Sequence, residues 1–286
     1  DGQLNIVAEC VNKESPYSTE FIHLMNHWYG YPDIPIGRPE NGIESNHGTT
    51  DYAQAVSQLT TADSIPVFHR KAFCNDSLQT SVAEYRRMLS LQPDSSVIII
   101  SVGFCTNLAR LLHSGPDDYS NESGLELVQR KVRLLSIMAG SFGPYPQVEY
   151  NVVKDIKAAQ TVVREWPTQV VFTPFEAGLT VMMKAKTIEN GLRWATLHPL
   201  HEAYASYQPM PYDTPTWDAL AVLYALEPNE KYFTLSSWGQ VSIDDEGYSR
   251  FTPQAHGRHA YISLTPEQAQ NASDRLEELI TRPAKR

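Results

Sequence analysis

The chain has 286 residues, 42% of them hydrophobic, and a formal net charge of -10. This length allows one large buried core, and the acidic charge, without a local cluster of Lys or Arg, disfavours nucleic acid and anionic membranes as partners. No segment approaches the roughly 18 consecutive apolar residues of a membrane-spanning helix. We therefore expect a soluble protein with a single domain over residues 1–286 and a small neutral ligand, in a cellular compartment that the sequence leaves open.

Five apolar runs in the first two thirds of the chain have the composition of buried strands in a parallel sheet. They are LNIVAECVN (4–12), DIPIG (33–37), SVIIISVG (96–103), RLLSIMAG (133–140) and TQVVFTPF (168–175). The first run is rich in β-branched residues, so we expect it to be buried on both faces.

Helical patterns lie between these runs, over residues 18–29, 80–91, 106–113 and 155–166. In the first of them one face carries Phe21, Leu24, Met25 and Trp28. Strands that alternate with helices indicate βαβ units. We therefore expect an α/β fold with an open, mostly parallel sheet and flanking helices. Two long polar loops, 39–63 and 114–123, are candidates for lining a pocket.

The order changes after Thr187. A mainly helical segment passes Trp194 and Tyr204, a loop follows over 209–216, and an apolar helix is expected over 217–226. Residues 231–252 alternate around Gly239 and an acidic turn at 244–247, a pattern typical of antiparallel hairpins. The last helix is predicted to start at Thr265-Pro266-Glu267, where a cap, a proline and an acidic residue follow in the expected order.

Three cysteines and three sequons carry little information about the compartment. Cys10, Cys74 and Cys105 are an odd number at wide spacing, which favours free thiols over a disulfide framework. Asn-x-Ser sequons begin at Asn75, Asn121 and Asn271, so glycosylation is an option at each of them.

Ligands in open parallel sheets bind at the carboxyl ends of the strands. The residues that follow the predicted strands are rich in amides, hydroxyls and carboxylates, a set that suits hydroxyl-rich ligands such as sugars or ribosides. They are Asn12, Thr106, Asn107, the segment 141–151 and Glu176.

Two carboxylate positions each allow two interpretations. Glu149 and Asn151 lie two residues apart, so in an extended loop both side chains would point the same way and could hold adjacent hydroxyls; alternatively, they are solvated loop residues. Asp218 lies at the start of an apolar helix, where it is either a helix cap or a ligand-binding carboxylate.

His198 and His201 are three residues apart and could bind zinc on one helical face. Pro199 lies between them, and no HExxH motif or clear third ligand accompanies them. His256 and His259 lie in what we expect to be a loop entering a strand. The sequence has no G-x-S-x-G, P-loop, G-x-G-x-x-G or C-x-x-C motif, which argues against serine hydrolases, NTPases, typical dinucleotide-binding folds and dithiol redox proteins.

Taken together, five ordered segments resemble the landmarks of the inosine-uridine preferring nucleoside hydrolase family. They are YGYPDIPIGRP, IIISVGFCTNLARLL, LSIMAGSFGPYPQVEYNVVKDIKAA, QVVFTPFEAG and PTWDALAVLYAL. The resemblance covers about Leu4 to the final helix and implies a Rossmann-like α/β fold that hydrolyses the N-glycosidic bond of ribonucleosides. It also implies Ca²⁺ as cofactor, a riboside as the small-molecule partner and a homo-oligomer.

The resemblance assigns roles to individual residues. Asp218 matches an aspartate that binds calcium and lies beside the sugar, and Thr106 matches a threonine whose backbone carbonyl also binds calcium. Glu149 and Asn151 match a pair that holds ribose hydroxyls, and Asn12 matches an asparagine that contacts the sugar. Oxygen ligands of this kind are those that calcium takes.

Two features depart from the family pattern. The aspartate segment D-x-D-x-x-x-D-D, with the strand that carries it, has no counterpart in this chain, so we expect no catalytic base here and, in the sheet, an additional N-terminal piece, a rearranged edge or a partner's strand. Trp217 stands where many relatives have a histidine that protonates the leaving base. The alternative to an enzyme is therefore a catalytically inactive homologue that binds sugars or nucleosides, in a lectin-like or storage role.

Overall fold

The structure, a computed structural model, describes residues 4–44, 51–71 and 73–284. The chain forms two compact units. Unit 1 comprises Asp1–Glu84, Met183–Thr214 and Glu277–Arg286, and unit 2 comprises Tyr85–Met182 and Pro215–Leu276. The single domain expected from the sequence stays a prediction.

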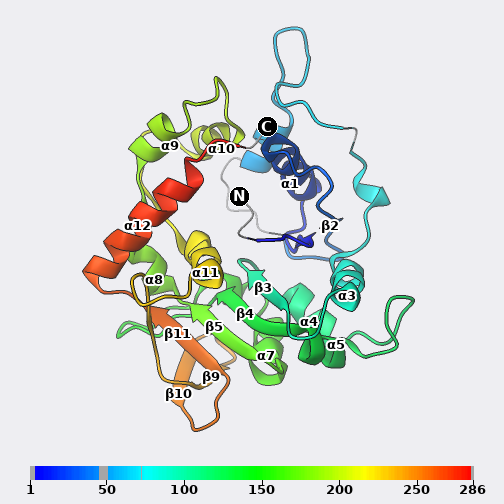
Figure 1. The fold of residues 1–286 in the computed structure, drawn as a ribbon, viewed down its shortest axis with the longest axis vertical. Coiled ribbons are helices and arrows are strands. Elements are labelled where there is room, and N and C mark those ends of the chain that lie inside the picture. Colours follow the sequence, from blue (N-terminus) through cyan, green and yellow to red (C-terminus); the bar gives the residue numbers. More distant parts are fainter. Residues whose placement is uncertain (1–3, 45–50, 72, 285–286) are drawn as a thin grey trace. The chain divides into compact units, whose positions relative to one another are not determined.

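The central feature of unit 2 is a 7-stranded sheet with the order β10-β9-β11-β5-β4-β3, in which β8 pairs with β11 (Figure 1). Its strands are β3 (Val97–Ser101), β4 (Val132–Met138), β5 (Gln169–Thr173), β8 (Thr234–Leu235), β9 (Gly239–Ile243), β10 (Ser249–Pro253) and β11 (His259–Ser263). The pairs β3–β4, β4–β5 and β5–β11 are parallel, whereas β9 pairs antiparallel with both β10 and β11. The mostly parallel α/β sheet expected from the sequence is confirmed, as are the three strands predicted over 96–175.

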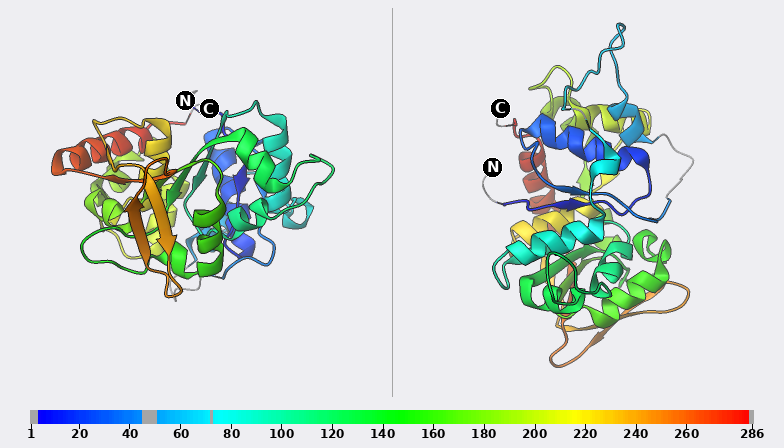
Figure 2. Two further views of the ribbon diagram at one scale, coloured as in Figure 1. Left: turned by 90° about the horizontal axis from the view of Figure 1, so that it is seen from below. Right: turned by 90° about the vertical axis from the view of Figure 1, so that its right-hand side faces the viewer.

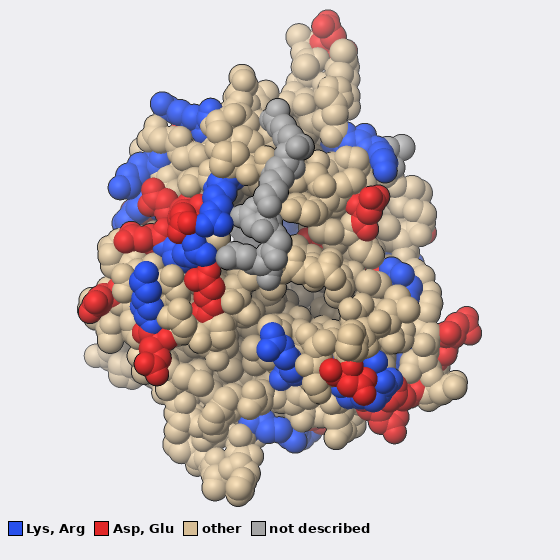
Figure 3. Space-filling model, viewed as in Figure 1, with Lys and Arg blue, Asp and Glu red and all other residues tan. Residues whose placement is uncertain are grey.

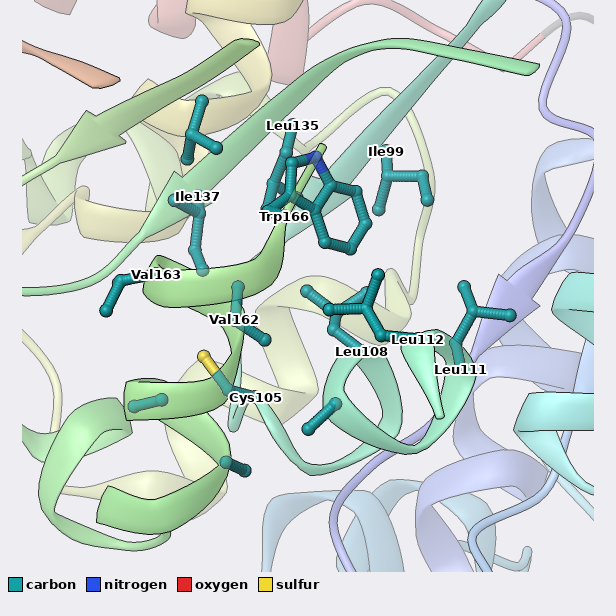
Figure 4. Close-up of a cluster of buried hydrophobic side chains, with 14 of the residues drawn as sticks. Ile99, Cys105, Leu108, Leu111, Leu112, Leu135, Ile137, Val162, Val163 and Trp166 are labelled. Atoms are coloured by element: carbon teal, nitrogen blue, oxygen red, sulfur yellow. The ribbon is translucent and has the colours of Figure 1, made fainter. Parts of the chain in front are cut away.

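Helices lie on both sides of this sheet (Figures 1 and 2). Unit 2 contains α4 (Thr106–Leu112), α5 (Gly124–Lys131), α6 (Tyr150–Val153), α7 (Ile156–Glu165), α8 (Phe175–Thr180) and α11 (Trp217–Leu226). On one face, α4, α5 and α7 enclose a core in which Trp166, fully buried, lies with Leu108, Leu135 and Ile137 (Figure 4). On the other face α11 packs on β4, where the Ser136 hydroxyl donates to the carbonyl oxygen of Ala221 over 2.8 Å.

The C-terminal part of unit 2 matches the predicted hairpin. The strands β9 and β10 flank the turn at 244–247, where Gly247 has a φ of +92°, a left-handed value that glycine adopts without strain. The helix α12 (Pro266–Ile280) begins as predicted, with the Thr265 hydroxyl accepting from the amide of Gln268 over 3.2 Å. The sequence did not predict that β11 joins the parallel part of the sheet beside β5.

Unit 1 holds the N-terminal elements and a helical insertion. They are β1 (Glu9–Cys10), α1 (Pro16–Tyr29), β2 (Ile36–Gly37), α2 (Tyr52–Ser57), the 3₁₀ turn η1 (Asn75–Ser77), α9 (Ala185–Gly191) and α10 (Pro199–Tyr207). Four elements cross from one unit to the other: α3 (Ser81–Leu91), the paired strands β6 (Met182–Met183) and β7 (Thr214–Pro215), and the helix α12. The predicted apolar face of α1 is confirmed, because Leu24 is buried with Phe21, Met25 and Trp28 around it.

The expectation for the first strand is wrong in extent and in burial. Only Glu9–Cys10 is strand, and it pairs in parallel with Ile36–Gly37 in a separate two-stranded sheet. Leu4 and Ile6 are 47% and 49% exposed. In the described part of the chain, β3 pairs only with β4. An apolar run forms a long buried strand only where neighbours pair with it, and this run has one short neighbour.

That the two polar loops line a pocket stays a prediction. Residues 114–123 surround the side chain of Arg86, which is 3% exposed and pairs with Asp117 over 2.6 Å. The same guanidinium donates to the hydroxyl of Ser114 and to the carbonyl oxygens of Ser120 and Glu122. The loop 39–63 contains α2, and residues 45–50 of it lie outside the described residues.

The surface and the helices agree with the composition. On the face that Figure 3 shows, Lys and Arg side chains lie beside Asp and Glu rather than in a basic patch. Within the described residues no helix is long and apolar enough to cross a membrane. The three cysteines are free, as predicted, with Cys105 buried, Cys10 half-buried and Cys74 exposed.

Candidate functional site

The residue Glu149 lies at the carboxyl end of β4, where the chain folds back after Gly140. Its carboxylate accepts three backbone N–H groups, from Asn151 over 2.8 Å, from Val152 over 3.2 Å and from Gly140 over 3.4 Å. Gly140 has a φ of +80°, and this left-handed conformation turns the chain at the end of the strand. Glu149 is therefore the N-cap of α6 and a fixed acceptor at the edge of the sheet.

Glu149 is buried at 3% exposure. Burial raises the pKa of its carboxyl to about 7, although the three amide bonds favour the charged form, and the charge of Asp218 raises it further. The structure therefore brings Glu149 and Asp218 within electrostatic reach of each other. Neither of the two forms an ion pair with a Lys, Arg or His among the residues that the structure describes.

Asp218 occupies the second position of α11. Its carboxylate makes no hydrogen bond within the described part of the chain, and the N-cap position belongs to Thr216. The interpretation of Asp218 as a helix cap is therefore wrong. Burial raises the pKa of Asp218 to about 6, yet the residue is accessible to solvent. A side chain that is surrounded by protein on several sides and open to water on one has both properties.

The segment that carries Asn151 is helical rather than extended. Because Glu149 caps α6 and Asn151 lies inside it, the two side chains do not alternate as they would on a strand. The Asn151 amide donates to the carbonyl oxygen of Met138 over 3.1 Å, and the residue is buried. This bond ties α6 to the end of β4 and keeps Glu149 in place.

Thr106 starts α4, directly after β3, and is buried. Its hydroxyl donates to Asp155 over 2.6 Å, and the other oxygen of Asp155 caps α7 by accepting from Ala158 over 3.1 Å. The sequence predicted a helix from Asp155 but not this bond. An aspartate before a helical pattern predicts the helix cap. The partner of Asp155, Thr106, lies 49 residues away in the sequence, and only the tertiary structure shows that the two are in contact.

The other predicted residues belong to other elements. Asn12 belongs to unit 1, two residues after β1, and is half-buried. Glu176 is in α8 and accepts from the amide of Phe142 over 2.7 Å. His198 caps α10 by accepting from Leu200, and burial lowers its pKa to about 4.

Two of the predicted residues could contribute donors to a metal site. Asp218 offers a carboxylate and Thr106 a carbonyl oxygen, which are donors of the kind that calcium takes, but calcium takes six to eight oxygens. Among the residues that the structure describes, no group of three or more His, Cys, Asp or Glu side chains could hold a metal ion, so His198 and His201 have no third ligand of this kind there. The described residues therefore do not by themselves form a calcium site.

Trp217 and Thr216, beside Asp218, are both fixed by hydrogen bonds. The Trp217 indole N–H donates to the carbonyl oxygen of Phe175 over 2.9 Å, and its ring stacks on Phe175 with centroids 5.7 Å apart. Gly178 leaves room for this ring, since a Cβ at that position would lie 2.0 Å from a Trp217 carbon. The Thr216 hydroxyl donates to the carbonyl oxygen of Val181 over 2.9 Å.

Comparisons with known proteins agree with this fold. The model of the family described as inosine-uridine preferring nucleoside hydrolase matches residues 22–272. Among solved structures, a plant nucleoside hydrolase, the PpNRh1 enzyme, is similar with a TM-score of 0.67 and 17% identity over 98% of this chain and 92% of that one.

Two bacterial structures are similar to the same degree. An inosine-uridine preferring nucleoside hydrolase from Bacillus anthracis has a TM-score of 0.67 and 15% identity over 95% of this chain and 88% of that one. A purine-preferring ribonucleoside hydrolase from Gardnerella vaginalis has a TM-score of 0.68 and 13% identity over 98% and 92%. No curated protein matches the sequence significantly. At these identities the structural similarity shows the fold alone.

Proposed function

The chain belongs to the inosine-uridine preferring nucleoside hydrolase family, and we propose that it binds ribonucleosides by their ribose hydroxyls and hydrolyses the N-glycosidic bond. The observation that carries this proposal is the pair Glu149 and Asp218. Two carboxylates without a basic partner lie at the carboxyl edge of a parallel sheet, where ligands of such folds bind.

In this proposal the two carboxylates have different tasks. Glu149 is held by three backbone N–H groups, so its remaining acceptor capacity has a fixed direction and suits a sugar hydroxyl. Asp218 is accessible and makes no bond of its own, so it accepts a second hydroxyl or the water that attacks the anomeric carbon. Asn151 positions Glu149 through Met138 rather than contacting the ligand with its amide.

The same charges assist bond cleavage. Departure of the base leaves positive charge on the ribose ring, as in other glycoside hydrolyses with an oxocarbenium-like transition state. Two carboxylates beside that ring stabilise the charge more strongly in the transition state than in the neutral substrate, and this difference is what accelerates a reaction. The described residues supply too few ligands to hold calcium by themselves, so these roles are assigned to the side chains alone.

A second candidate is a protein that binds ribosides without cleaving them. It is favoured by one observation, the lack of any group of three metal-binding side chains among the described residues. Binding needs only the acceptors at Glu149 and Asp218, whereas hydrolysis also needs an activated water.

The test is to measure binding and turnover with the same protein. Calorimetry with inosine and uridine gives the dissociation constants, and a reducing-sugar assay detects released ribose. We expect both ligands to bind, and Asp218→Asn to weaken binding by about tenfold or more, equivalent to about 1.4 kcal/mol.

The control is Asp118→Asn, which removes the same charge from an exposed loop position. It should bind inosine and uridine like the wild type. Release of ribose supports the hydrolase, and binding without release supports the second candidate. If neither nucleoside binds, or if Asp218→Asn binds as tightly as the wild type, the proposed site is wrong.

A further inference from the structure

We infer that Glu176 is a positioning residue for the proposed reaction, because it holds the segment 141–149 and so sets the spacing between Glu149 and Asp218. This inference rests on the proposed function and deepens it. Glu176 lies after β5 at the carboxyl edge of the sheet, in the first turn of α8. A set of hydrogen bonds joins three segments of unit 2 at this turn.

The carboxylate of Glu176 binds the segment 141–149 near its start. Its Oε1 accepts from the backbone N–H of Phe142 over 2.7 Å, and the charge on the acceptor strengthens such a bond. Gly143 lies on the same carboxyl group, because a Cβ at Gly143 would be 3.5 Å from the Cδ of Glu176. The first residues of the segment are therefore held against α8.

The preceding residue, Phe175, joins the same region to the start of α11. Its N–H donates to the carbonyl oxygen of Gly140 over 2.8 Å, and its own carbonyl oxygen accepts from the indole N–H of Trp217 over 2.9 Å. Gly140 in turn donates to Glu149, and Trp217 directly precedes Asp218. The first turn of α8 therefore connects the two carboxylates of the proposed site.

Two other polar side chains at these strand ends do not hold the segment. The Ser249 hydroxyl lies 3.0 Å from the position that a Cβ of Gly140 would take, and Thr173, the last residue of β5, is fully buried. Both hydroxyls are without a hydrogen-bond partner among the described residues. The bond that a side chain of this group makes to the segment is the one from Glu176 to Phe142.

The second oxygen of Glu176 shows which property of the side chain this role needs. Oε2 is buried, and no group in the described part of the chain donates to it. An amide in place of the carboxylate would therefore break no bond at Oε2, and its carbonyl oxygen would still accept from Phe142. The role depends on the reach of the side chain and not on its charge.

A shift of the segment 141–149 would move Glu149 relative to Asp218. A ribose that bonds to two fixed acceptors loses one of these bonds when their spacing changes. Misplacement of a site by about 1 Å can lower a rate by about 10²-fold. We therefore expect the affinity for ribosides to depend on the bond between Glu176 and Phe142.

Two substitutions separate reach from charge. Glu176→Gln keeps the length and an acceptor oxygen but loses the charge, whereas Glu176→Asp keeps the charge but is one methylene shorter. We expect the dissociation constant for inosine, measured by calorimetry, to rise about tenfold or more in Glu176→Asp, equivalent to about 1.4 kcal/mol. In Glu176→Gln it should stay within about threefold of the wild type.

The matched control is Glu126→Asp, which draws a carboxylate back from another backbone N–H of unit 2, that of Ser123, bonded over 2.8 Å. It should bind inosine like the wild type. Hydrogen exchange reports the bond itself without a ligand. The amide of Phe142 should exchange about tenfold or more faster in Glu176→Asp than in the wild type, and at the wild-type rate in Glu176→Gln.

Weaker binding in Glu176→Asp, with faster exchange at Phe142 and an unchanged Glu176→Gln, supports the inference. Weaker binding in Glu176→Gln would show that the charge itself contacts the ligand. Wild-type affinity in Glu176→Asp, even with faster exchange, would show that the bond to Phe142 is only structural. Either result overturns the inference and leaves the proposed function intact. If the wild type binds neither inosine nor uridine, the proposed function and the inference are both wrong.

Discussion

Two buried charges in unit 2 show opposite solutions to the same physical problem. Arg86 is 3% exposed and pairs with Asp117, while its remaining N–H groups donate to Ser114 and to two carbonyl oxygens. Glu149 is equally buried at 3%, but its partners are neutral amides and its charged neighbour, Asp218, has the same sign.

The difference separates a structural charge from a binding one. A buried charge with an opposite partner and a full set of hydrogen bonds holds the loop 114–123 on the sheet. A buried carboxylate without such a partner costs stability, and groups with this property cluster where ligands bind. Four measurements test this contrast, from the largest expected effect to the smallest.

The largest effect is expected for Arg86→Ala. Removing the guanidinium leaves Asp117 without its ion-pair partner and the carbonyl oxygen of Glu122 without its donor, whereas the carbonyl oxygen of Ser120 keeps the N–H of Asp117. We expect the free energy of unfolding to fall by about 3–5 kcal/mol, measured by denaturant unfolding. Asp118→Asn, in the same loop, is the control and should change it by less than about 0.5 kcal/mol. A small loss in Arg86→Ala would show that the cluster is not structural.

Glu149→Gln is expected to raise the free energy of unfolding, the opposite of the effect expected for Arg86→Ala. The folded-state pKa of Glu149 is about 7, above the ordinary value of 4.5. The folded protein therefore binds the proton more tightly than the unfolded chain, so this group imposes no penalty below pH 4.5 and a full penalty above pH 7. The variant removes that penalty.

We expect Glu149→Gln to equal the wild type in stability near pH 4 and to exceed it by on the order of 1–3 kcal/mol at pH 8. His198 and His259, whose pKa values burial lowers to about 4, act in the opposite direction in both proteins, so the difference between the two unfolding curves isolates Glu149. Riboside affinity should fall by about tenfold or more. If Glu149→Gln is less stable than the wild type at pH 8, the charge of Glu149 is structural, like that of Arg86.

Gly178→Ala tests whether Trp217 is rigid. In an ordinary helix this change is favourable, but here the new Cβ would lie 2.0 Å from a carbon of Trp217. We expect a loss of about 1–3 kcal/mol from overpacking. Gly143→Ala is the matched control, because its nearest contacts lie at 3.5 Å and it should be close to neutral. Equal stability of the two variants would show that the indole can move and that its N–H is available.

Added calcium is expected to have the smallest effect, which is measured as a change in the melting temperature. If a bound cation neutralised the charges of Glu149 and Asp218, as Asp117 neutralises the charge of Arg86, the melting temperature would rise with calcium concentration. Because the described residues supply too few ligands, we expect calcium and chelator to give melting temperatures within about 1 °C of each other. A larger rise that disappears in Asp218→Ala would restore the calcium site implied by the family resemblance.

The sequence by itself determined the local elements and the family. The runs that became β3, β4 and β5, the helix over 217–226 and the cap at Thr265 follow from short-range periodicity and capping preferences, which depend on neighbours a few residues away. The ordered motifs also identified the family. Because Glu149 and Thr106 follow predicted strands, the sequence also predicted that both lie at the carboxyl edge of the sheet.

Only the tertiary structure decided what those side chains do. The bond from the Gly140 amide to Glu149, the coupling of Glu149 to Asp218 and the use of the Trp217 N–H by Phe175 all join residues from separate segments of the chain. The same holds for β1. Its apolar run predicted a long buried strand, but in the structure β1 pairs only with the two-residue strand β2. Pairing, burial and the compensation of charge depend on contacts between distant segments, and local sequence patterns do not encode them.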